Sequence, residues 1–190
     1  MKKASANPSH IIGILALQGS FAEHMAMLVR IGVPAKLIRS RADTKNITAC
    51  IIPGGESTTM MQMLKSTGLD QWLIASAKAG MPMYGACAGM IVLANLGLID
   101  IQINRNAYGP QLYSFEDAVS FRANAVSRGI SSMLGIFIRA PRVLSASPKV
   151  QILAKHGRDP VLVRQKNILA GSFHPELTQN TSIHEYFCGM

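Results

Sequence analysis

One cysteine lies in surroundings that nucleophilic chemistry needs. Cys87 is the centre of GACAG (85–89), which follows the apolar run 82–84 and precedes the apolar run 90–94. Gly-x-Cys-x-Gly between a strand and a helix is typical of a nucleophile elbow that carries a thiol. Small neighbours avoid clashes in the strained turn, and the N-terminus of the next helix favours the reactive thiolate. The alternative is a buried, inert cysteine in a small-residue turn.

A cysteine nucleophile needs a base and a group that orients the base. His174 ends the apolar run 168–173, and ligands bind at the carboxyl ends of strands in α/β sheets. Pro175 stiffens the following turn, and Glu176 is close enough in sequence to fix the imidazole. By itself this pattern also fits a surface loop that happens to contain His and Glu. Combined with the elbow, it predicts a Cys87–His174–Glu176 triad.

The other four histidines give weaker signals. His24 is expected on a helix surface, although it can line the site if the N-terminus of that helix faces the pocket. His10, His156 and His184 are expected in surface segments, and no role is assigned to them.

A glycine pair marks a third candidate element. In PGGES (53–57) the two glycines follow an apolar run, so the turn can expose backbone N–H groups. Such groups stabilise a developing oxyanion by about 3 kcal/mol per donor. The alternative is an ordinary glycine turn capped by Ser57. The stretch is not a Walker phosphate loop, because no lysine follows at the required position.

The elements that must position these residues follow an α/β pattern. Apolar runs predict strands at 11–17, 35–39 and 49–53, and helical spacing predicts helices at 21–31, 58–65 and 69–78. Ser20 is expected to cap the first helix together with Glu23, and Gly32 to end it. This alternation predicts right-handed βαβ units and a doubly wound, mostly parallel sheet.

The second half of the chain has a different character. A strand is expected at 97–103, the stretch to Ser120 is expected to be loop-rich, and a short helix is expected at 182–187. Further β-like runs lie at 136–138, 150–154, 161–163 and 168–173. We expect a flexible segment at 1–10 and a single domain at 11–190.

Composition narrows the classes of function. A chain of 190 residues with 48% hydrophobic and 15% charged residues is globular. Three cysteines without paired spacing indicate a reducing, cytoplasmic setting and no metal site. No run is long enough for a membrane span, and a signal peptide is not expected. The net charge of +9 is spread without an aromatic platform, which argues against nucleic acid and leaves an acidic protein partner as an alternative to a solvated surface.

The order of the motifs resembles that of class I, triad-type glutamine amidotransferases. It resembles more narrowly the family of glutaminase subunits of pyridoxal 5′-phosphate synthase, from about residue 11 to about residue 187. The stretches that carry this resemblance are LALQG (15–19), EH (23–24), PGGESTT (53–59), GACAG (85–89), RNAYG (105–109), SFE (114–116), FIRAP (137–141) and SFHPELT (172–178).

The resemblance implies a three-layer α/β/α sandwich with a flavodoxin-like central sheet, and a role for each matching residue. Cys87 would be the nucleophile, His174 the base and Glu176 its orienter. N–H groups of Gly55 and Ala88 would form the oxyanion hole. The implied L-glutamine contacts are Gly55, Glu56, Ser57, Arg105, Ile138 and Arg139. Gln18 would lie where the synthase subunit docks in a hetero-oligomer. Neither a metal nor an organic cofactor is implied.

The sequence departs from the family pattern after RNAYG. Pro110 stands where the family usually has a second Arg, so any contact made by that Arg is in doubt. Two other functions stay open: an elbow-cysteine peptidase or deglycase-like hydrolase of a related fold, and a non-catalytic binding subunit. The first would not need PGGES or two Arg near a substrate carboxylate, and the second would lack the nucleophile or the base.

Overall fold

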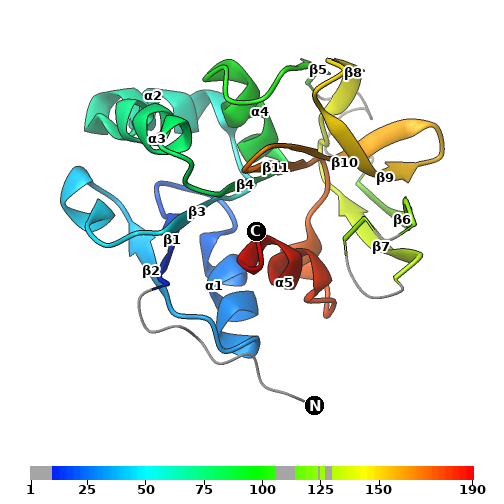
Figure 1. Cartoon of the computed structure of the whole chain (residues 1–190), viewed down its shortest axis with the longest axis horizontal. Helices are drawn as coiled ribbons and strands as arrows, with labels where there is room; N and C mark the ends of the chain where they lie inside the picture. Colours follow the sequence, from blue (N-terminus) through cyan, green and yellow to red (C-terminus); the bar gives the residue numbers. More distant parts are fainter. Residues whose placement is uncertain (1–9, 106–113, 124, 127–129) are drawn as a thin grey trace.

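A nine-stranded mixed sheet forms the centre of the molecule (Figure 1). The computed structural model describes residues 10–105, 114–123, 125–126 and 130–190. The strands of the main sheet are, in spatial order, β2 (Ala35–Ile38), β1 (Ile12–Leu15), β3 (Ala49–Ile52), β4 (Met83–Ala86), β11 (Ile168–Gly171), β10 (Asp159–Gln165), β9 (Gln151–His156), β6 (Phe115–Phe121) and β7 (Ser132–Phe137).

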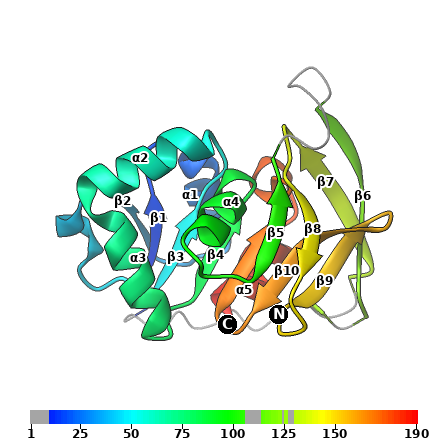
Figure 2. The ribbon, with the colours of Figure 1, turned by 90° about the horizontal axis from the view of Figure 1, so that it is seen from above.

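The first five strands in this order are parallel to one another. The strands β1, β3, β4 and β11 are buried throughout, which fits their continuous apolar sequences, since helices cover both faces of this half. From β11 onward the pairing through β10, β9, β6 and β7 is antiparallel (Figure 2). A separate antiparallel pair is formed by β5 (Ile101–Asn104) and β8 (Arg142–Ala146).

Helices form the two outer layers (Figure 1). On one face of the sheet lie α1 (Phe21–Arg30) and α5 (Ser182–Cys188), and on the other lie α2 (Ser57–Thr67), α3 (Leu69–Lys78) and α4 (Ala88–Asn95). Two 3-10 helices, η1 (Arg41–Thr44) and η3 (Pro175–Leu177), lie in connections. None of the helices in the described residues is long and apolar enough to cross a membrane.

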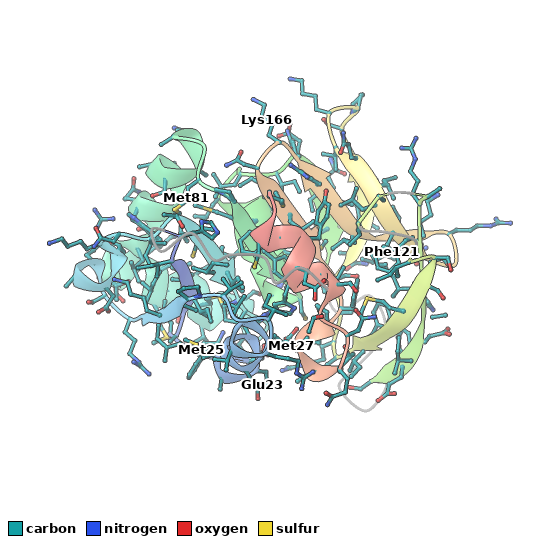
Figure 3. The ribbon with its side chains drawn as sticks, turned by 60° about the horizontal axis from the view of Figure 1, so that its bottom comes forward. Glu23, Met25, Met27, Met81, Phe121 and Lys166 are labelled. Atoms are coloured by element: carbon teal, nitrogen blue, oxygen red, sulfur yellow. The ribbon has the colours of Figure 1, made fainter. Side chains whose placement is uncertain are left out.

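Alternation along the central strands divides the core between the two faces. Ile14 of β1 packs in the cluster that contains Leu28 of α1 and Phe187 of α5, whereas its neighbour Leu15 packs with Met60 of α2. On α1 itself, Glu23 is exposed and Met27 is buried (Figure 3). The helix is therefore amphipathic, as its spacing predicts.

The predicted fold class is confirmed, with two strands added. Segment 115–121 forms β6 although it was expected to be mostly loop, and β8 was not expected at all. The strand expected at 97–103 begins only at Ile101. The single domain at 11–190 stays a prediction. The flexible segment at 1–10 lies outside the described residues except for His10, which contacts Thr48 Oγ1 at 2.8 Å.

Candidate active site

Cys87 lies on a sharp turn between β4 and α4. Its φ of 48° and ψ of −105° are strained for a residue with a side chain. A Cβ added to Gly85 would lie 2.5 Å from the carbonyl carbon of Gly89, and one added to Gly89 would lie 2.1 Å from the backbone oxygen of Ile52. The chain can turn here only because both flanking residues are glycine. The elbow expected from Gly-x-Cys-x-Gly is present.

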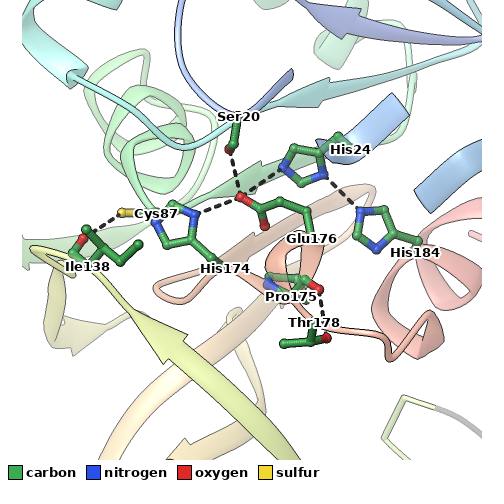
Figure 4. Close-up of polar contacts among 9 residues, drawn as sticks. All are labelled: Ser20, His24, Cys87, Ile138, His174, Pro175, Glu176, Thr178 and His184. Carbon is green, nitrogen blue, oxygen red and sulfur yellow. Dashed lines mark hydrogen bonds and ion pairs between the residues drawn. The ribbon is translucent and has the colours of Figure 1, made fainter. Parts of the chain in front are cut away.

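The neighbouring strand β11 delivers His174 to the same edge of the sheet. Ala86 and Gly171, at the ends of β4 and β11, are partners in parallel pairing, so the two strands end side by side at the same edge of the sheet. Figure 4 shows the imidazole of His174 between the sulfur of Cys87 and the carboxylate of Glu176. His174 Nδ1 lies 2.7 Å from Glu176 Oε1, and Cys87 Sγ lies 3.6 Å from the backbone oxygen of Ile138.

His174 and Glu176 stabilise each other's charged form. Burial acts to lower the pKa of His174, but hydrogen bonds with Cys87 and Glu176 outweigh it and raise that pKa to about 10. Burial acts to raise the pKa of Glu176, but His24, His174 and Ser20 outweigh it and lower that pKa to about 2. At neutral pH an imidazolium is therefore bound to a carboxylate, with the thiol of Cys87 on its other side.

The glycine loop after β3 lies against the imidazole. A Cβ on Gly54 would be 2.3 Å from His174 Cε1, so only glycine allows this approach. Gln18 holds the loop from the other side: its Nε2 donates to the backbone oxygen of Glu56 at 2.9 Å, and its Oε1 accepts from the N–H of Glu56 at 3.1 Å. Gly55, with φ of 151°, lies directly under the Gln18 amide.

Two arginines lie at the rim of this region. Arg139 Nη2 and Glu56 Oε1 form a partly exposed ion pair at 2.6 Å. Arg105 Nη2 donates to Thr58 Oγ1 at 2.9 Å. A groove of about 320 Å³ is lined by Ser57, Thr58, Met61, Gln62, Lys65, Asn95 and Arg105. This groove reaches the N-terminus of α2. Cys87 is not among its lining residues and exposes only 5% of its surface.

The structure thus places the predicted residues in two groups. Cys87, His174, Glu176 and Ile138 are joined by contacts, and Gln18, Gly55 and Glu56 form the adjoining loop contact. Ala88 begins α4 directly after the thiol and is buried. Arg105 is one contact further out, at Thr58. Pro110 lies outside the described residues. Within the described part of the chain, no group of His, Cys, Asp and Glu could hold a metal ion.

Sequence reasoning was wrong about two side chains near Glu176. Ser20 directly precedes α1, but its hydroxyl makes no cap and instead donates to Glu176 Oε1 at 2.7 Å. His184 was expected on the surface and is fully buried. For His24 a helix surface and a position lining the site were both open; it is fully buried, with Nε2 3.6 Å from Glu176 Oε1, which agrees with the second. The spacing of Ser20 and His24 carried a usable signal, because residues four apart on a helix share a face.

The elbow, the imidazole and the carboxylate at the carboxyl edge of a parallel sheet place the chain among α/β proteins with a cysteine at the nucleophile position. The model of the SNO glutamine amidotransferase family matches residues 14–190, and the chain belongs to this family. The resemblance drawn from the motifs is confirmed.

Individual relatives agree with this membership. The pyridoxal 5′-phosphate synthase subunit PdxT of Bifidobacterium longum is 45% identical over 188 residues, covering 94% of this chain and 99% of the relative. PdxT of Thermosipho africanus is 43% identical, covering 94% and 97%. A crystal structure described as a glutamine amidotransferase is 38% identical with a TM-score of 0.86, covering 94% and 99%. PurLQS of Thermotoga maritima, 13% identical with a TM-score of 0.74 and coverage of 95% and 98%, is similar in fold alone.

Proposed function

We propose that this chain is the glutaminase subunit of a pyridoxal 5′-phosphate synthase. It hydrolyses the side-chain amide of L-glutamine to L-glutamate and ammonia, and the ammonia passes to a synthase subunit that builds pyridoxal 5′-phosphate, a form of vitamin B6. The observation that carries the proposal is the position of the His174 imidazole between the sulfur of Cys87 and the carboxylate of Glu176 (Figure 4), in a member of a glutamine amidotransferase family.

The order of contacts supports a two-step mechanism. The Cys87 thiolate attacks the carboxamide carbon of glutamine and forms a tetrahedral oxyanion. The imidazolium of His174 gives its proton to the amide nitrogen, the C–N bond breaks, and ammonia leaves a glutamyl thioester on sulfur. Neutral His174 then removes a proton from water, which attacks the thioester and releases glutamate. Glu176 holds the ring and stabilises its charged form throughout.

The surrounding residues supply binding and charge stabilisation in this proposal. Backbone N–H groups of Gly55 and Ala88 bind the oxyanion. Arg105 and Arg139 bind the α-carboxylate of glutamine, and Glu56 faces its α-ammonium group. The remaining contacts of the substrate are with Ser57 and Ile138. The present ion pair of Arg139 with Glu56 therefore exchanges for contacts with the two charged groups of the substrate.

Partner dependence follows from the covered thiol. Cys87 is almost fully buried, and Gln18 clamps the loop that contains Gly55. We propose that the synthase subunit docks around Gln18, moves this loop and opens the site, which makes the active form a hetero-oligomer. A cytoplasmic location is proposed because Cys50, Cys87 and Cys188 are all free thiols.

The proposal is tested by measuring glutamate and ammonia released from L-glutamine, with and without purified synthase subunit. We expect strong stimulation by the synthase subunit and complete loss of activity in Cys87→Ala. Hydrolysis that persists in Cys87→Ala would contradict the mechanism. Hydrolysis of peptide or glycated substrates, with none of glutamine, would favour the alternative of an elbow-cysteine peptidase or deglycase-like hydrolase.

A further inference from the structure

Two buried histidines extend the line of contacts beyond Glu176. His24 of α1 and His184 of α5 join through Nδ1 and Nε2 at 2.9 Å, and the other nitrogen of His24, Nε2, lies 3.6 Å from Glu176 Oε1 (Figure 4). Both rings are completely buried. The mechanism above uses neither, although burying two imidazoles costs free energy unless their polar atoms gain something in return.

The neighbours determine which nitrogens carry protons. If His24 donated from Nδ1, its bare Nε2 lone pair would face the Glu176 carboxylate. His184 would then carry a buried Nδ1–H, and that atom has no hydrogen-bond partner in the described structure. If His184 donates from Nε2, His24 carries its proton on Nε2. That atom makes no hydrogen bond either, but it lies 3.6 Å from the Glu176 carboxylate, whose negative charge attracts an N–H and repels a bare lone pair. The second arrangement is therefore favoured on electrostatic grounds.

Both imidazoles are neutral at physiological pH. Burial lowers the pKa of His24; Glu176 and Glu23 act to raise it, and His174 acts to lower it further. Burial and His24 lower the pKa of His184 to about 3 against the opposing effect of Glu176. The pair therefore acts on Glu176 through oriented N–H dipoles rather than through a full positive charge.

The carboxylate needs such donors because Glu176 is buried. Glu176 Oε1 accepts from Ser20 Oγ and from His174 Nδ1, each at 2.7 Å. Its other oxygen, Oε2, has no partner among the described residues. The ring of Tyr84 lies 6.0 Å from that of His24 and 6.1 Å from that of His184, and it walls off this side of the site. The N–H of His24 is thus a third group directed at the same carboxylate oxygen.

We propose that His184 and His24 are positioning residues for the glutaminase reaction, acting in series through Glu176 on His174. His184 fixes the tautomer of His24, His24 favours the ionised carboxylate, and the carboxylate keeps His174 protonated and directed at Cys87. The inference rests on the proposed function for its chemical meaning, but its structural part stands on the contacts of these buried groups.

The test compares His24→Phe, which keeps the ring and removes both nitrogens, with His24→Gln, which restores an amide donor and acceptor. Phe187→Leu is the matched control. Phe187 lies on the same helix as His184, and its substitution loosens the packing against Tyr84 without removing a contact among His184, His24 and Glu176. Glutaminase kinetics are measured in the complex with the synthase subunit. In parallel, the pH titration of the His174 imidazole is followed by NMR on the free chain.

We expect His24→Phe to lower kcat about tenfold with KM unchanged, because His24 does not touch glutamine; tenfold corresponds to about 1.4 kcal/mol. The pH at which the His174 imidazolium loses its proton should move downward, since the carboxylate that stabilises it is less stabilised as an ion. His24→Gln should recover most of kcat, and His184→Phe should show a smaller change of the same sign. Phe187→Leu should lower thermal stability and leave both readouts in place.

Two results would overturn the inference: equal kcat and equal His174 titrations for wild type and His24→Phe, or the same losses in His24→Phe, His24→Gln and Phe187→Leu. The His174 titration does not depend on glutamine or on a partner. A wild-type chain that released no ammonia with the synthase subunit would therefore refute the proposed function and leave the inference open to its own measurement.

Discussion

Gly89 provides a sharp test of the elbow, because the obstacle to a side chain there is backbone. In Gly89→Ala the new Cβ would lie 2.1 Å from the carbonyl oxygen of Ile52 in β3. Real Cβ atoms do not approach other heavy atoms closer than 3.0 Å, so the start of α4 or the end of β3 must move by about an ångström. Overpacking of this kind costs about 1–3 kcal/mol. A displacement of about 1 Å near a nucleophile costs roughly 100-fold in rate.

Two assays measure these effects separately. Urea unfolding should show the midpoint falling by about 0.5–1.5 M, for a slope of about 2 kcal/mol per M. Glutaminase activity at equal concentrations of folded complex should fall by about two orders of magnitude. Gly171→Ala is the control, since its Cβ would meet the end of the Leu162 side chain at 3.3 Å and the Tyr84 hydroxyl at an ordinary 3.6 Å, and its stability should stay within about 0.5 kcal/mol of wild type. Unchanged stability and activity in Gly89→Ala would refute the steric account.

Further predictions concern charge and docking. The raised pKa of His174 means that its stabilising contribution is complete below pH 6.5 and is lost as the pH rises to about 10; His174→Gln should therefore flatten the decline in unfolding free energy over this interval. The lowered pKa of Glu176 acts in the opposite sense, with stability lost as the pH falls from 4.5 toward 2, and Glu176→Gln should flatten that acid limb. Arg139→Ala should raise KM for glutamine about 10- to 100-fold with a smaller change in kcat, and an unchanged KM would remove Arg139 from the substrate site. Gln18→Ala removes two hydrogen bonds to Glu56 and should reduce stimulation by the synthase subunit about tenfold in the ammonia assay; full stimulation would place docking elsewhere.

The sequence was most informative where steric demands are local. Gly85 and Gly89 are required by contacts of 2.5 Å and 2.1 Å, and the pattern around Cys87 therefore predicted the turn itself. The meeting of Cys87 with His174 followed from the rule that parallel strands deliver their carboxyl ends to one edge. The parallel half was predictable for a related reason, since strands covered on both faces carry continuous apolar runs.

The antiparallel half gave weaker signals. In β6, the side chains at positions 115–118 are partly or fully exposed, three of them are polar or small, and burial begins only at Val119. In β8, Leu144 points outward and is largely exposed, so the sequence lacks the alternation of apolar and polar residues that indicates a half-buried strand. Strands of this kind are specified by cross-strand partners far away in the sequence rather than by their own composition.

The buried histidines were hard to place for a different reason. A histidine on a helix is polar by type, so a surface position was expected for His184 and was one of two alternatives for His24. The contact of His24 is with Glu176, which belongs to a segment more than 150 residues away in the sequence. His184 does lie in the apolar stripe of α5 beside Ile183 and Phe187, and that stripe was visible in the sequence.

The helix α1 has a property that engineering of this enzyme can use. At its N-terminal end, the hydroxyl of Ser20 donates to the carboxylate of Glu176, and Nε2 of His24 lies 3.6 Å from the same carboxylate. Near its other end Val29 is 68% exposed, and Arg30 donates to the backbone oxygen of Gln179. A helix is stiff along its axis, so a shift imposed at the solvent end is transmitted to the donors of Glu176. Given the proposed role of Glu176, we expect substitutions on the exposed surface of α1 to change turnover while every substrate-contacting atom stays as it is.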